Sequence, residues 1–506
     1  MTAHELLARA LGHAAPDDRV DLSAWGRALD GACRGVTHDS RQVGPGWIFV
    51  ALRGLKADGA AFAPQAVAAG AVAIVADRPA AAAPPGVPWI VVSDARLALA
   101  WLAAEFFGHP SRQMRVVGIT GTNGKTTTAY LVSAIFEAAG VACGLLGTVT
   151  YRIGDRETAA SRTTPEAPEL QGMMRDMVGA GCGACAMEVS SHALALRRAD
   201  GVRFAAGAFT NLTRDHLDFH ANMEDYFAAK RRLFELLPPG APAAINLDDP
   251  RGPAMAEACA APVTYAISRA ADVTPGPLAV TLDGLAFEVR TPRGAIAVRS
   301  TLVGRPNVSN ILAAVTVATS LDVPLEAVAR GLAGLRGVPG RFERVSSAKD
   351  DIAVIVDYAH TDDALRNLLE TARPLAARRL ITVFGAGGDR DRAKRPLMGM
   401  VAARLSDVVV ITSDNPRSED PRRIIDEVGL GVQPEARQRS VEVRTVVDRR
   451  EAILHAVSEA SAGDLVLIAG KGHEQYQELD GRTVPFDDVT VAREALDARR
   501  HRVRVG

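Results

Sequence analysis

The chain has 506 residues, several times the length of a single-core domain, so we expect two to four domains. Hydrophobic residues make up 48% and charged residues 23% of the chain, which is typical of a globular enzyme. A formal net charge of -1 gives no support for a surface that binds nucleic acid or membrane. Cys182 and Cys185 have the spacing of a metal or redox pair, but no second pair accompanies them, so we interpret them as structural.

The first part of the chain predicts a small α/β unit. Its N-terminus has acidic residues and no basic-then-apolar signal pattern, so we expect a cytoplasmic protein. The apolar stretch 60–75 contains Pro64 and Gly70, so it predicts a helix followed by a strand and not a membrane span. The proline- and alanine-rich stretch 78–85 predicts a loop. Strands are predicted at 47–52, 71–76 and 88–92.

Two further α/β blocks follow, one opening near residue 113 and one near residue 340. Buried strands alternate with helical segments in both, which predicts mostly parallel sheets covered by helices. The second block also contains two runs between residues 280 and 302 in which apolar and polar residues alternate. These runs predict a β-hairpin. Strands are predicted at 115–120, 184–189, 204–211, 243–246, 352–356, 380–384, 408–412 and 465–468, and helices at 126–139 and 308–321.

A glycine-rich segment, Gly-Ile-Thr-Gly-Thr-Asn-Gly-Lys-Thr at 118–126, joins a predicted strand to a predicted helix. Glycines at such a junction let backbone N–H groups approach phosphate oxygens, and the helix N-terminus adds the positive end of its dipole. Lys125 is then placed to reach the β- and γ-phosphates, and Thr126 to hold Mg²⁺ through its hydroxyl. Ile119 replaces the first glycine of the strict P-loop pattern, so a glycine-rich turn without nucleotide is the alternative.

Acidic and histidine residues follow the next predicted strands: Glu188, Asp215 and His216. Anionic oxygens are the ligands that Mg²⁺ prefers, and α/β sheets bind ligands at the carboxyl ends of their strands. These residues are therefore candidates for holding the cation that accompanies ATP. From the residues alone, Glu188 could instead cap the following helix, and His216 could be a core histidine with its hydrogen bonds satisfied.

An ordered set of short motifs covers nearly the whole chain. The phosphate loop is followed by Met-Glu-Val-Ser-Ser-His at 187–192 and Asn-Leu-Thr-Arg-Asp-His at 211–216. Later motifs are Gly-Arg-Phe-Glu at 340–343, Asp-Tyr-Ala-His at 357–360, Gly-Asp-Arg-Asp at 388–391, Asp-Asn-Pro-Arg at 414–417 and Gly-Lys-Gly-His-Glu at 470–474. This set resembles the Mur ligase family. The resemblance implies a UDP-sugar-binding domain at 1–108, a central P-loop ATPase domain with a mostly parallel sheet at 109–338, and a C-terminal Rossmann-like amino-acid-binding domain at 339–506.

The resemblance also implies an ATP-dependent ligase of peptidoglycan precursor synthesis, which adds meso-diaminopimelate to UDP-N-acetylmuramoyl-L-Ala-D-Glu through an acyl phosphate. It assigns catalysis to Lys125, Glu188, His216, Lys230 and Arg341. Mg²⁺ would be held by Thr126, Glu188, His216 and Lys230 in carbamylated form. The implied ATP-binding residues are Gly121, Thr122, Asn123, Gly124, Lys125, Thr126, Thr127, Asn310 and His360.

Lys230 matches the family lysine that is carbamylated. A lysine must be neutral to react with carbon dioxide, and burial favours the neutral form by lowering the pKa. The product is a carboxylate on a long arm that can reach Mg²⁺. Because Arg231 and Arg232 follow it, the residues alone favour an ordinary solvated basic helix face.

For the UDP-sugar dipeptide, the resemblance implies Ser40, Thr163, Thr164, Ser190 and Arg198. The planar guanidinium of Arg198 can pair with a carboxylate of the dipeptide, although the residues alone suggest a surface arginine beside Arg197. The sequence departs from the family pattern at Arg162 and Leu196, which leaves two of these contacts open, and at Pro306 and Asp362, where loop shape is affected.

For the added amino acid, the resemblance implies Arg390, Asp414, Asn415, Pro416, Arg417, Gly470 and Glu474. Pro416 predicts a rigid turn at the carboxyl end of a strand. Arg390 and Arg417 would attract the far carboxylate of meso-diaminopimelate and repel lysine, which has only an ammonium there. Glu474 and Gly470 would receive the far ammonium. The alternative is a plain turn with Arg417 solvated beside residues 418–420.

Other functions remain open at this stage. The chain could be another Mur ligase or the related folyl-polyglutamate ligase, a P-loop NTPase switch or chaperone, or a non-catalytic binding module. The motifs at 414–417 and 470–474 favour the diaminopimelate ligase. We expect small-molecule substrates, no nucleic acid or membrane partner, and a monomer.

Overall fold

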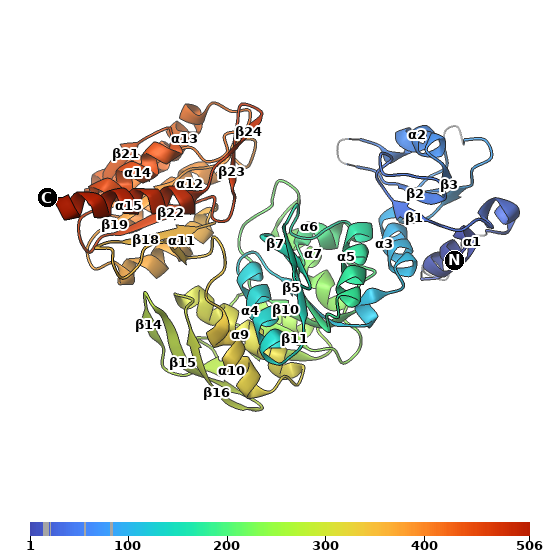
Figure 1. Ribbon diagram of the computed structural model, residues 1–506, viewed down its shortest axis with the longest axis horizontal. Helices are drawn as coiled ribbons and strands as arrows, with labels where there is room; N and C mark the ends of the chain where they lie inside the picture. Colours follow the sequence, from blue (N-terminus) through green and yellow to red (C-terminus); the bar gives the residue numbers. More distant parts are fainter. Residues whose placement is uncertain (14–19, 21, 55–56, 81–83, 506) are drawn as a thin grey trace.

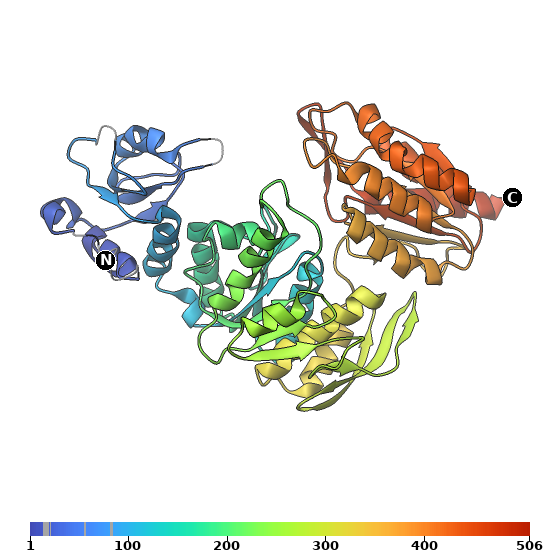
Figure 2. The same ribbon diagram turned by 180° about the vertical axis from the view of Figure 1, so that it is seen from behind.

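The computed structural model describes residues 1–13, 20, 22–54, 57–80 and 84–505. The chain forms consecutive N-terminal, central and C-terminal bodies, and the two termini lie at opposite ends of the molecule (Figure 1). The view from behind shows the same order, with the central body joining the other two (Figure 2). Within the described residues, we find no helix with the length and apolarity needed to cross a membrane.

The N-terminal body is built on a parallel sheet in the order β1-β2-β3-β4. Alternate residues of β2 face opposite sides: Ile48 and Val50 pack with α1 and α3, whereas Phe49 packs with α2. Thr2 and Glu5 start α1 with reciprocal side-chain-to-backbone hydrogen bonds. The elements are α1 (Ala3–Leu11), η2 (Ser23–Leu29), β1 (Gly35–Thr37), β2 (Trp47–Ala51), η3 (Gly59–Phe62), α2 (Ala63–Ala68), β3 (Ala71–Ala76), β4 (Trp89–Val91) and α3 (Ala95–Phe106).

The central body is built on a sheet in the order β12-β11-β10-β5-β9-β6-β7-β8, which is parallel as far as β6. Helices α4 and α9 pack on one face, and α5 and α7 on the other. The short η4 (Pro110–Arg112) leads into it from α3. Its elements are β5 (Arg115–Thr120), α4 (Lys125–Ala138), β6 (Cys143–Leu146), β7 (Thr150–Ile153), β8 (Arg156–Ala159), α5 (Ala167–Gly179), β9 (Ala184–Glu188), α6 (Ser191–Ala195), β10 (Phe204–Phe209), α7 (Met223–Glu235), β11 (Ala243–Asn246), α8 (Gly252–Glu257) and β12 (Pro262–Tyr265).

An antiparallel sheet extends the central body and packs against α10. The hairpin predicted between residues 280 and 302 is confirmed as β15 and β16, whereas β13 and β14 were not predicted. These edge strands are very short, so no alternation of apolar residues marks them. The elements are β13 (Thr274–Pro275), β14 (Ala279–Thr281), β15 (Gly284–Thr291), β16 (Gly294–Ser300), α9 (Arg305–Ser320) and α10 (Leu325–Gly334).

The C-terminal body has a sheet in the order β17-β18-β22-β19-β20-β21, parallel except for β17. Helices α11 to α13 cover one face, and α14 and α15 the other. The elements are β17 (Glu343–Arg344), β18 (Ala353–Asp357), α11 (Asp362–Ala372), η5 (Arg373–Leu375), β19 (Leu380–Phe384), α12 (Lys394–Leu405), β20 (Val408–Ile411), α13 (Pro421–Arg439), β21 (Glu442–Thr445), α14 (Arg449–Glu459), β22 (Leu465–Ala469), β23 (Tyr476–Leu479), β24 (Arg482–Pro485) and α15 (Asp488–Val505).

The expected α/β architecture with mostly parallel sheets is therefore present. Cys182 and Cys185 are buried free cysteines in the core beneath α5, as their structural interpretation requires. The loop expected at 78–85 lies partly outside the described residues, which stop at residue 80 and resume at residue 84.

Candidate active site

The phosphate loop runs from the end of β5 to the start of α4 and needs its glycines. Gly121 and Gly124 have φ values of 150° and 84°. A Cβ on Gly121 would lie 1.8 Å from Thr210 Oγ1, and one on Gly124 would lie 2.3 Å from Asn310 Oδ1. A side chain at either position would displace these neighbours, so the loop backbone stays open at the N-terminus of α4.

Lys125 and Lys230 meet at a single backbone carbonyl of this loop. The Nζ atoms of both lysines donate to the Gly121 oxygen at 2.8 Å, and Lys125 also donates to the Thr122 oxygen at 2.7 Å. Burial lowers the pKa of Lys125. Burial and the adjacent charge of Lys125 place the pKa of Lys230 well below its usual range. Since Lys230 on α7 is 1% exposed, the solvated-face interpretation of this residue is wrong.

Glu188 ends β9 and is buried beside the loop. Its Oε1 accepts from the Thr148 backbone N–H at 2.8 Å, and its Oε2 accepts from the Thr148 hydroxyl at 3.0 Å. The following helix is capped by Ser190, whose Oγ accepts from the Ala193 N–H at 3.2 Å. The interpretation of Glu188 as that helix cap is therefore wrong. Burial lowers the pKa of Lys125, and the charge of Glu188 partly opposes this effect.

His216 lies in the loop after β10 and has a left-handed φ of 54°. Its backbone N–H donates to Asp215 Oδ1 at 2.8 Å, and its ring Nε2 lies 3.5 Å from Asp215 Oδ2. Burial lowers the pKa of His216 to about 4, so the ring is neutral near pH 7 and can offer a lone pair. Because 42% of its side chain is exposed, it is not the core histidine of the alternative interpretation.

The residues around the loop fit Mg²⁺ as it binds with nucleotides. The ion usually takes one or two protein ligands together with waters and phosphate oxygens. Thr126 and Glu188 supply a hydroxyl and a carboxylate, both buried. The Thr126 hydroxyl accepts a hydrogen bond from Arg341 Nη2 at 3.2 Å, and the Nε of Arg341 is buried without a partner among the described residues.

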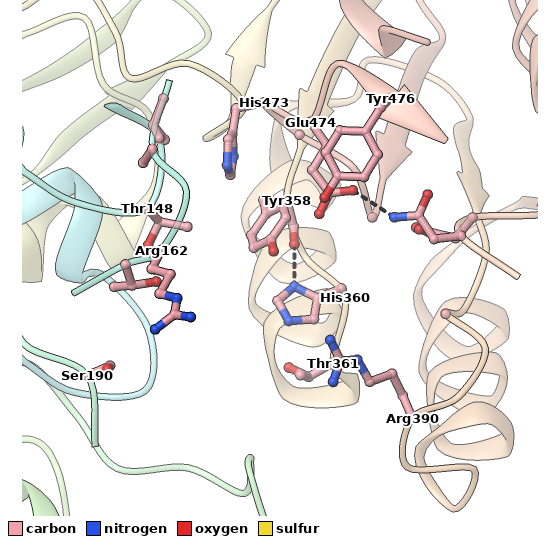
Figure 3. Close-up of a pocket in the computed structure, with 18 of the residues that line it drawn as sticks. Thr148, Arg162, Ser190, Tyr358, His360, Thr361, Arg390, His473, Glu474 and Tyr476 are labelled. Atoms are coloured by element: carbon pink, nitrogen blue, oxygen red, sulfur yellow. Dashed lines mark hydrogen bonds between the residues drawn. The ribbon is translucent and has the colours of Figure 1, made fainter. Parts of the chain in front are cut away.

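A cavity of about 1140 Å³ lies between the central and C-terminal bodies. Figure 3 shows Thr148, Arg162 and Ser190 on its central side, facing His360 and Arg390 on its C-terminal side. The candidate residues that line it are Thr163, Thr164, Ser190, Arg198, His216, His360, Arg390, Asp414, Asn415, Arg417, Gly470 and Glu474. The folded chain thus brings together segments more than 200 residues apart in sequence.

Arg198 is held on the central side of this cavity. Its Nη2 pairs with Glu166 Oε1 at 2.7 Å, and its Nη1 donates to the Thr164 carbonyl at 3.2 Å. Arg162 Nη1 donates to the same Glu166 oxygen at 2.6 Å. The side chain of Arg198 is 14% exposed, so the surface-arginine interpretation is wrong. Its Nε is buried without a partner among the described residues, which leaves a donor for a ligand.

On the C-terminal side, Asn415 organises a network of charged groups. Its Nδ2 donates to Glu474 Oε2 at 2.9 Å, and its Oδ1 accepts from the buried Lys471 Nζ at 2.8 Å. Burial raises the pKa of Glu474, against the opposing effect of Lys471. A Cβ on Gly470 would lie 2.4 Å from Asp414 Oδ2, so this position requires glycine.

Arg417 follows the turn at Pro416, and its guanidinium makes a contact at each end. Its Nη1 donates to the Gly388 carbonyl at 2.8 Å, and its Nε lies 2.7 Å from Glu478 Oε2. Arg390 projects into the cavity from the neighbouring loop (Figure 3). The solvated-turn interpretation of Arg417 is therefore wrong.

Comparison with known proteins identifies the family. Models named Mur ligase family, catalytic domain, Mur ligase middle domain, and Mur ligase, glutamate ligase domain match residues 33–107, 119–318 and 340–472. The UDP-N-acetylmuramoyl-L-alanyl-D-glutamate--2,6-diaminopimelate ligase of Gloeobacter violaceus is 48% identical over 502 residues, covering 99% of both chains. The chain belongs to the Mur ligase family.

Further similarities agree with this Mur ligase assignment. The ligase of the same name from Solibacter usitatus is 48% identical, covering 91% of this chain and 93% of its own. A solved ligase of that name superposes with a TM-score of 0.69 at 34% identity and covers 99% of both chains. MurF from Acinetobacter baumannii shares the fold, with a TM-score of 0.64 at 19% identity and coverage of 92% and 95%. The three-domain α/β fold expected from the sequence is confirmed.

Other candidate residues of this Mur ligase lie outside the cavity lining. Ser40 lies after β1 and donates to Gln65 Oε1 at 3.0 Å, within the N-terminal domain. Asn123 joins the phosphate loop to the C-terminal domain by donating to Asp363 Oδ2 at 3.2 Å. Thr122 and Thr127 are buried in the loop and in α4.

The four departures from the family pattern have clear local positions. Arg162 pairs with Glu166, and Leu196 is the C-cap residue that follows α6. Pro306 lies in the first turn of α9, where a missing N–H is tolerated. Asp362 begins α11, where a negative charge suits the helix dipole.

Sequence reasoning missed several polar residues of the site. Glu166 holds two arginines and had no motif to mark it. Lys471 was part of a recognised motif, yet its full burial was not anticipated. Lys394 donates to the His360 carbonyl at 2.9 Å, a contact between segments that no local pattern could reveal.

Proposed function

We propose that this Mur ligase is an ATP-dependent enzyme that adds meso-diaminopimelate to UDP-N-acetylmuramoyl-L-Ala-D-Glu. The observation that carries the proposal is the cavity in which Arg198 on one side faces Arg390 and Arg417 on the other. The full-length similarity to diaminopimelate ligases supports the same substrates. The reaction belongs to peptidoglycan precursor synthesis, and we place it in the cytoplasm, with the enzyme acting as a monomer.

The first step activates a carboxylate of the dipeptide. The side-chain carboxylate of D-Glu forms a bond to the γ-phosphorus of ATP, the bond to the β,γ-bridging oxygen breaks, and ADP leaves. Catalysis of phosphoryl transfer is mainly positioning and neutralisation of charge. Lys125 at the loop and Arg341, which reaches α4, supply positive charge, and Arg198 orients the dipeptide.

The second step forms the amide bond. The neutral amine of diaminopimelate attacks the carbonyl carbon of the acyl phosphate. The tetrahedral intermediate gives up a proton from this nitrogen and collapses as the bond from carbon to the phosphate oxygen breaks, so inorganic phosphate leaves with the proton. Lys394 donates to the His360 carbonyl, and His360 Nδ1–H donates to the Tyr358 carbonyl at 2.8 Å. These two hydrogen bonds position this wall of the cavity. In the proposal, His360 and Asn310 contact the adenine ring.

Mg²⁺ would be held by Thr126, Glu188, His216 and the carbamate of Lys230. When bound, the ion neutralises charge on the phosphate oxygens. The protein prepares this site by burying Lys230, whose neutral amine can bond to carbon dioxide and lose a proton to give a carbamate. The anionic carbamate would attract the neighbouring Lys125, whereas a protonated Lys230 would repel it.

Selection of the amino acid rests on charge. In the proposal, Arg417 and Arg390 bind the far carboxylate of meso-diaminopimelate, and Glu474 accepts a hydrogen bond from its far ammonium. Asp414, Asn415, Pro416 and Gly470 shape this subsite. Lysine lacks the far carboxylate and would leave the two guanidinium groups without their partner, so its affinity for the site should be much lower.

The test is phosphate release by the purified protein with ATP, Mg²⁺ and the UDP-sugar dipeptide. Meso-diaminopimelate and L-lysine are added in parallel, and the product is weighed by mass spectrometry. We expect release that depends on diaminopimelate and a product heavier by one residue. Release with lysine would refute the proposed specificity, and release without any acceptor would favour an NTPase.

A further inference from the structure

A cluster of two histidines and a glutamate lies away from the cavity, where the N-terminal and central domains join. His13 Nε2 lies 3.2 Å from Glu105 Oε1, and His109 Nε2 lies 2.7 Å from the same oxygen. One ligand atom from each residue lies within 4.8 Å of the other two. Among the described residues, no other group of three His, Cys, Asp or Glu side chains converges in this way.

The donor set suits a divalent transition metal. Two imidazole nitrogens and one carboxylate oxygen form a common zinc ligand set, with metal–ligand distances of about 2.0–2.2 Å and a water in the fourth position. Ligand atoms at the corners of such a tetrahedron lie roughly 3.3 Å apart. The separations of 3.2 Å and 2.7 Å at Glu105 are close to this spacing, so small side-chain rotations would admit an ion.

The surroundings orient the rings and leave the site accessible. The ring of His13 stacks on Trp101, with centroids 4.0 Å apart and planes inclined by 15°. The side chains of Glu105 and His109 are 12% and 13% exposed, whereas that of His13 is 33% exposed. An ion could therefore enter from solvent beside His13 and keep a water ligand there.

The cluster joins segments that control the link between two domains. His13 follows α1, Glu105 lies in the last turn of α3, and His109 lies in the connection to η4 and β5. Gly108 and His109 have φ values of 70° and 51°, so the chain turns sharply at this connection. An ion bound here would tie α1 to α3 and restrict the bend between the N-terminal and central domains.

We propose that His13, Glu105 and His109 form a binding site for a zinc-class divalent metal ion that braces the link between these domains. The site is separate from the nucleotide cation site, because none of its residues lines the cavity or the phosphate loop. It does not depend on which amino acid the ligase adds.

The test is a calorimetric titration of the full-length, chelator-treated protein with ZnCl₂, in excess Mg²⁺ to occupy the nucleotide cation site. The variants are His109→Ala and Glu105→Gln, with His13→Asn as a mild change at the more exposed ligand. The exposed His501 provides the matched control His501→Ala. We expect the wild-type protein and the His501→Ala control to bind one equivalent of zinc. Each ligand variant should bind zinc at least roughly tenfold more weakly.

A second measurement reads the site directly. Co²⁺ in place of zinc should give the visible absorption of a tetrahedral ion in wild-type protein, and His109→Ala should lose it. Thermal unfolding without metal checks that each variant is folded. Equal zinc stoichiometry and affinity in wild type and all three ligand variants would overturn the proposal and leave only a hydrogen-bonded triad.

Discussion

At the scale of single residues, burial changes what an ionisable side chain can do. Lys230 belongs to a run of basic residues, yet its side chain is fully buried, while the side chain of the next residue, Arg231, is 45% exposed. An amine held in a low-dielectric environment beside another cation favours its neutral form. The same side chain on the outer face of α7 would be a plain ammonium without this chemistry.

We predict that Lys230→Ala lowers turnover by roughly 10²- to 10³-fold, because it removes the carbamate proposed to hold the Mg²⁺ that neutralises the phosphate charge. The exposed neighbour gives the control Arg231→Ala, which should keep wild-type turnover. Incubation with ¹³C-bicarbonate should give a carbamate signal in the wild-type NMR spectrum that is absent from the variant. Full turnover by Lys230→Ala would refute the proposed role.

A second residue-scale prediction concerns Arg417. Hydrogen bonds to charged groups contribute about 1.5–3 kcal/mol, so Arg417→Ala should raise the KM for meso-diaminopimelate by roughly 10- to 100-fold. The KM for ATP should stay near its wild-type value, because the residue lies in the amino-acid subsite. Arg422→Ala, on the exposed side of α13, is the control. Equal increases in the KM for meso-diaminopimelate and the KM for ATP would mean that Arg417 only supports the fold through its contacts with Gly388 and Glu478.

At the scale of elements, a strand, a tight turn and a helix together make the phosphate loop. Strand β5 is buried on both faces, and α4 begins directly after Gly124 with left-handed φ. The backbone can follow this path only without side chains at the two glycines, where Thr210 and Asn310 pack closely. The position of the helix N-terminus therefore depends on two neighbouring elements, β10 and α9.

We predict that Gly121→Ala destabilises the protein by about 1–3 kcal/mol through overpacking against Thr210. Nucleotide affinity should fall as well, because the loop backbone must move away from its phosphate-binding path. Gly179→Ala at the end of α5 is the control, since its added methyl group meets no atom within 4 Å. Thermal unfolding and calorimetric binding of ADP measure the two effects. If Gly121→Ala left both the thermal stability and the affinity for ADP unchanged, the loop would be able to accommodate the added methyl group.

At the scale of the whole molecule, polar contacts join the central and C-terminal domains beside the cavity. Asn123 contacts Asp363, and Arg214 Nη2 lies 3.3 Å from Asp391 Oδ2 across the cavity. An exposed ion pair of this kind contributes about 0–1 kcal/mol. Such an interface permits the domains to close on substrates and open again.

The pH dependence of stability should report on this interface. Burial and the nearby charge of Arg341 lower the pKa of His473 from 6.5 to about 4. Between these values the unfolded chain binds more protons than the folded one, so stability falls as the pH falls from 6.5 towards 4. His473→Asn should therefore lose less stability than the wild type over this range.

The measurement is the thermal midpoint of the wild type, His473→Asn and the control His501→Asn at several pH values between 4.5 and 7, chosen to span roughly the interval between the two pKa values. The control should follow the wild-type curve. Parallel curves for the wild type and His473→Asn would rule out this histidine as a source of the pH dependence.

Much of the fold could be predicted because it depends on local patterns. The strands at 115–120, 243–246 and 380–384 were predicted with the bounds that the structure shows, since short buried apolar runs between turns mark them. The phosphate loop was predicted from its glycines. The short strands β13, β14 and β17 were not predicted, because a strand of two or three residues is too short to show a periodic pattern of apolar residues.

The sequence by itself determined the architecture, the order of the domains and the family, because hydrophobic periodicity and ordered motifs are properties of neighbouring residues. Only the tertiary structure decided which side chains share one environment. It brought Lys230 to the Gly121 carbonyl, Glu166 to Arg198, and His13 to Glu105, contacts that span many residues of chain. Burial and charge proximity set the chemistry of these groups, and both depend on segments that meet only when the chain has folded.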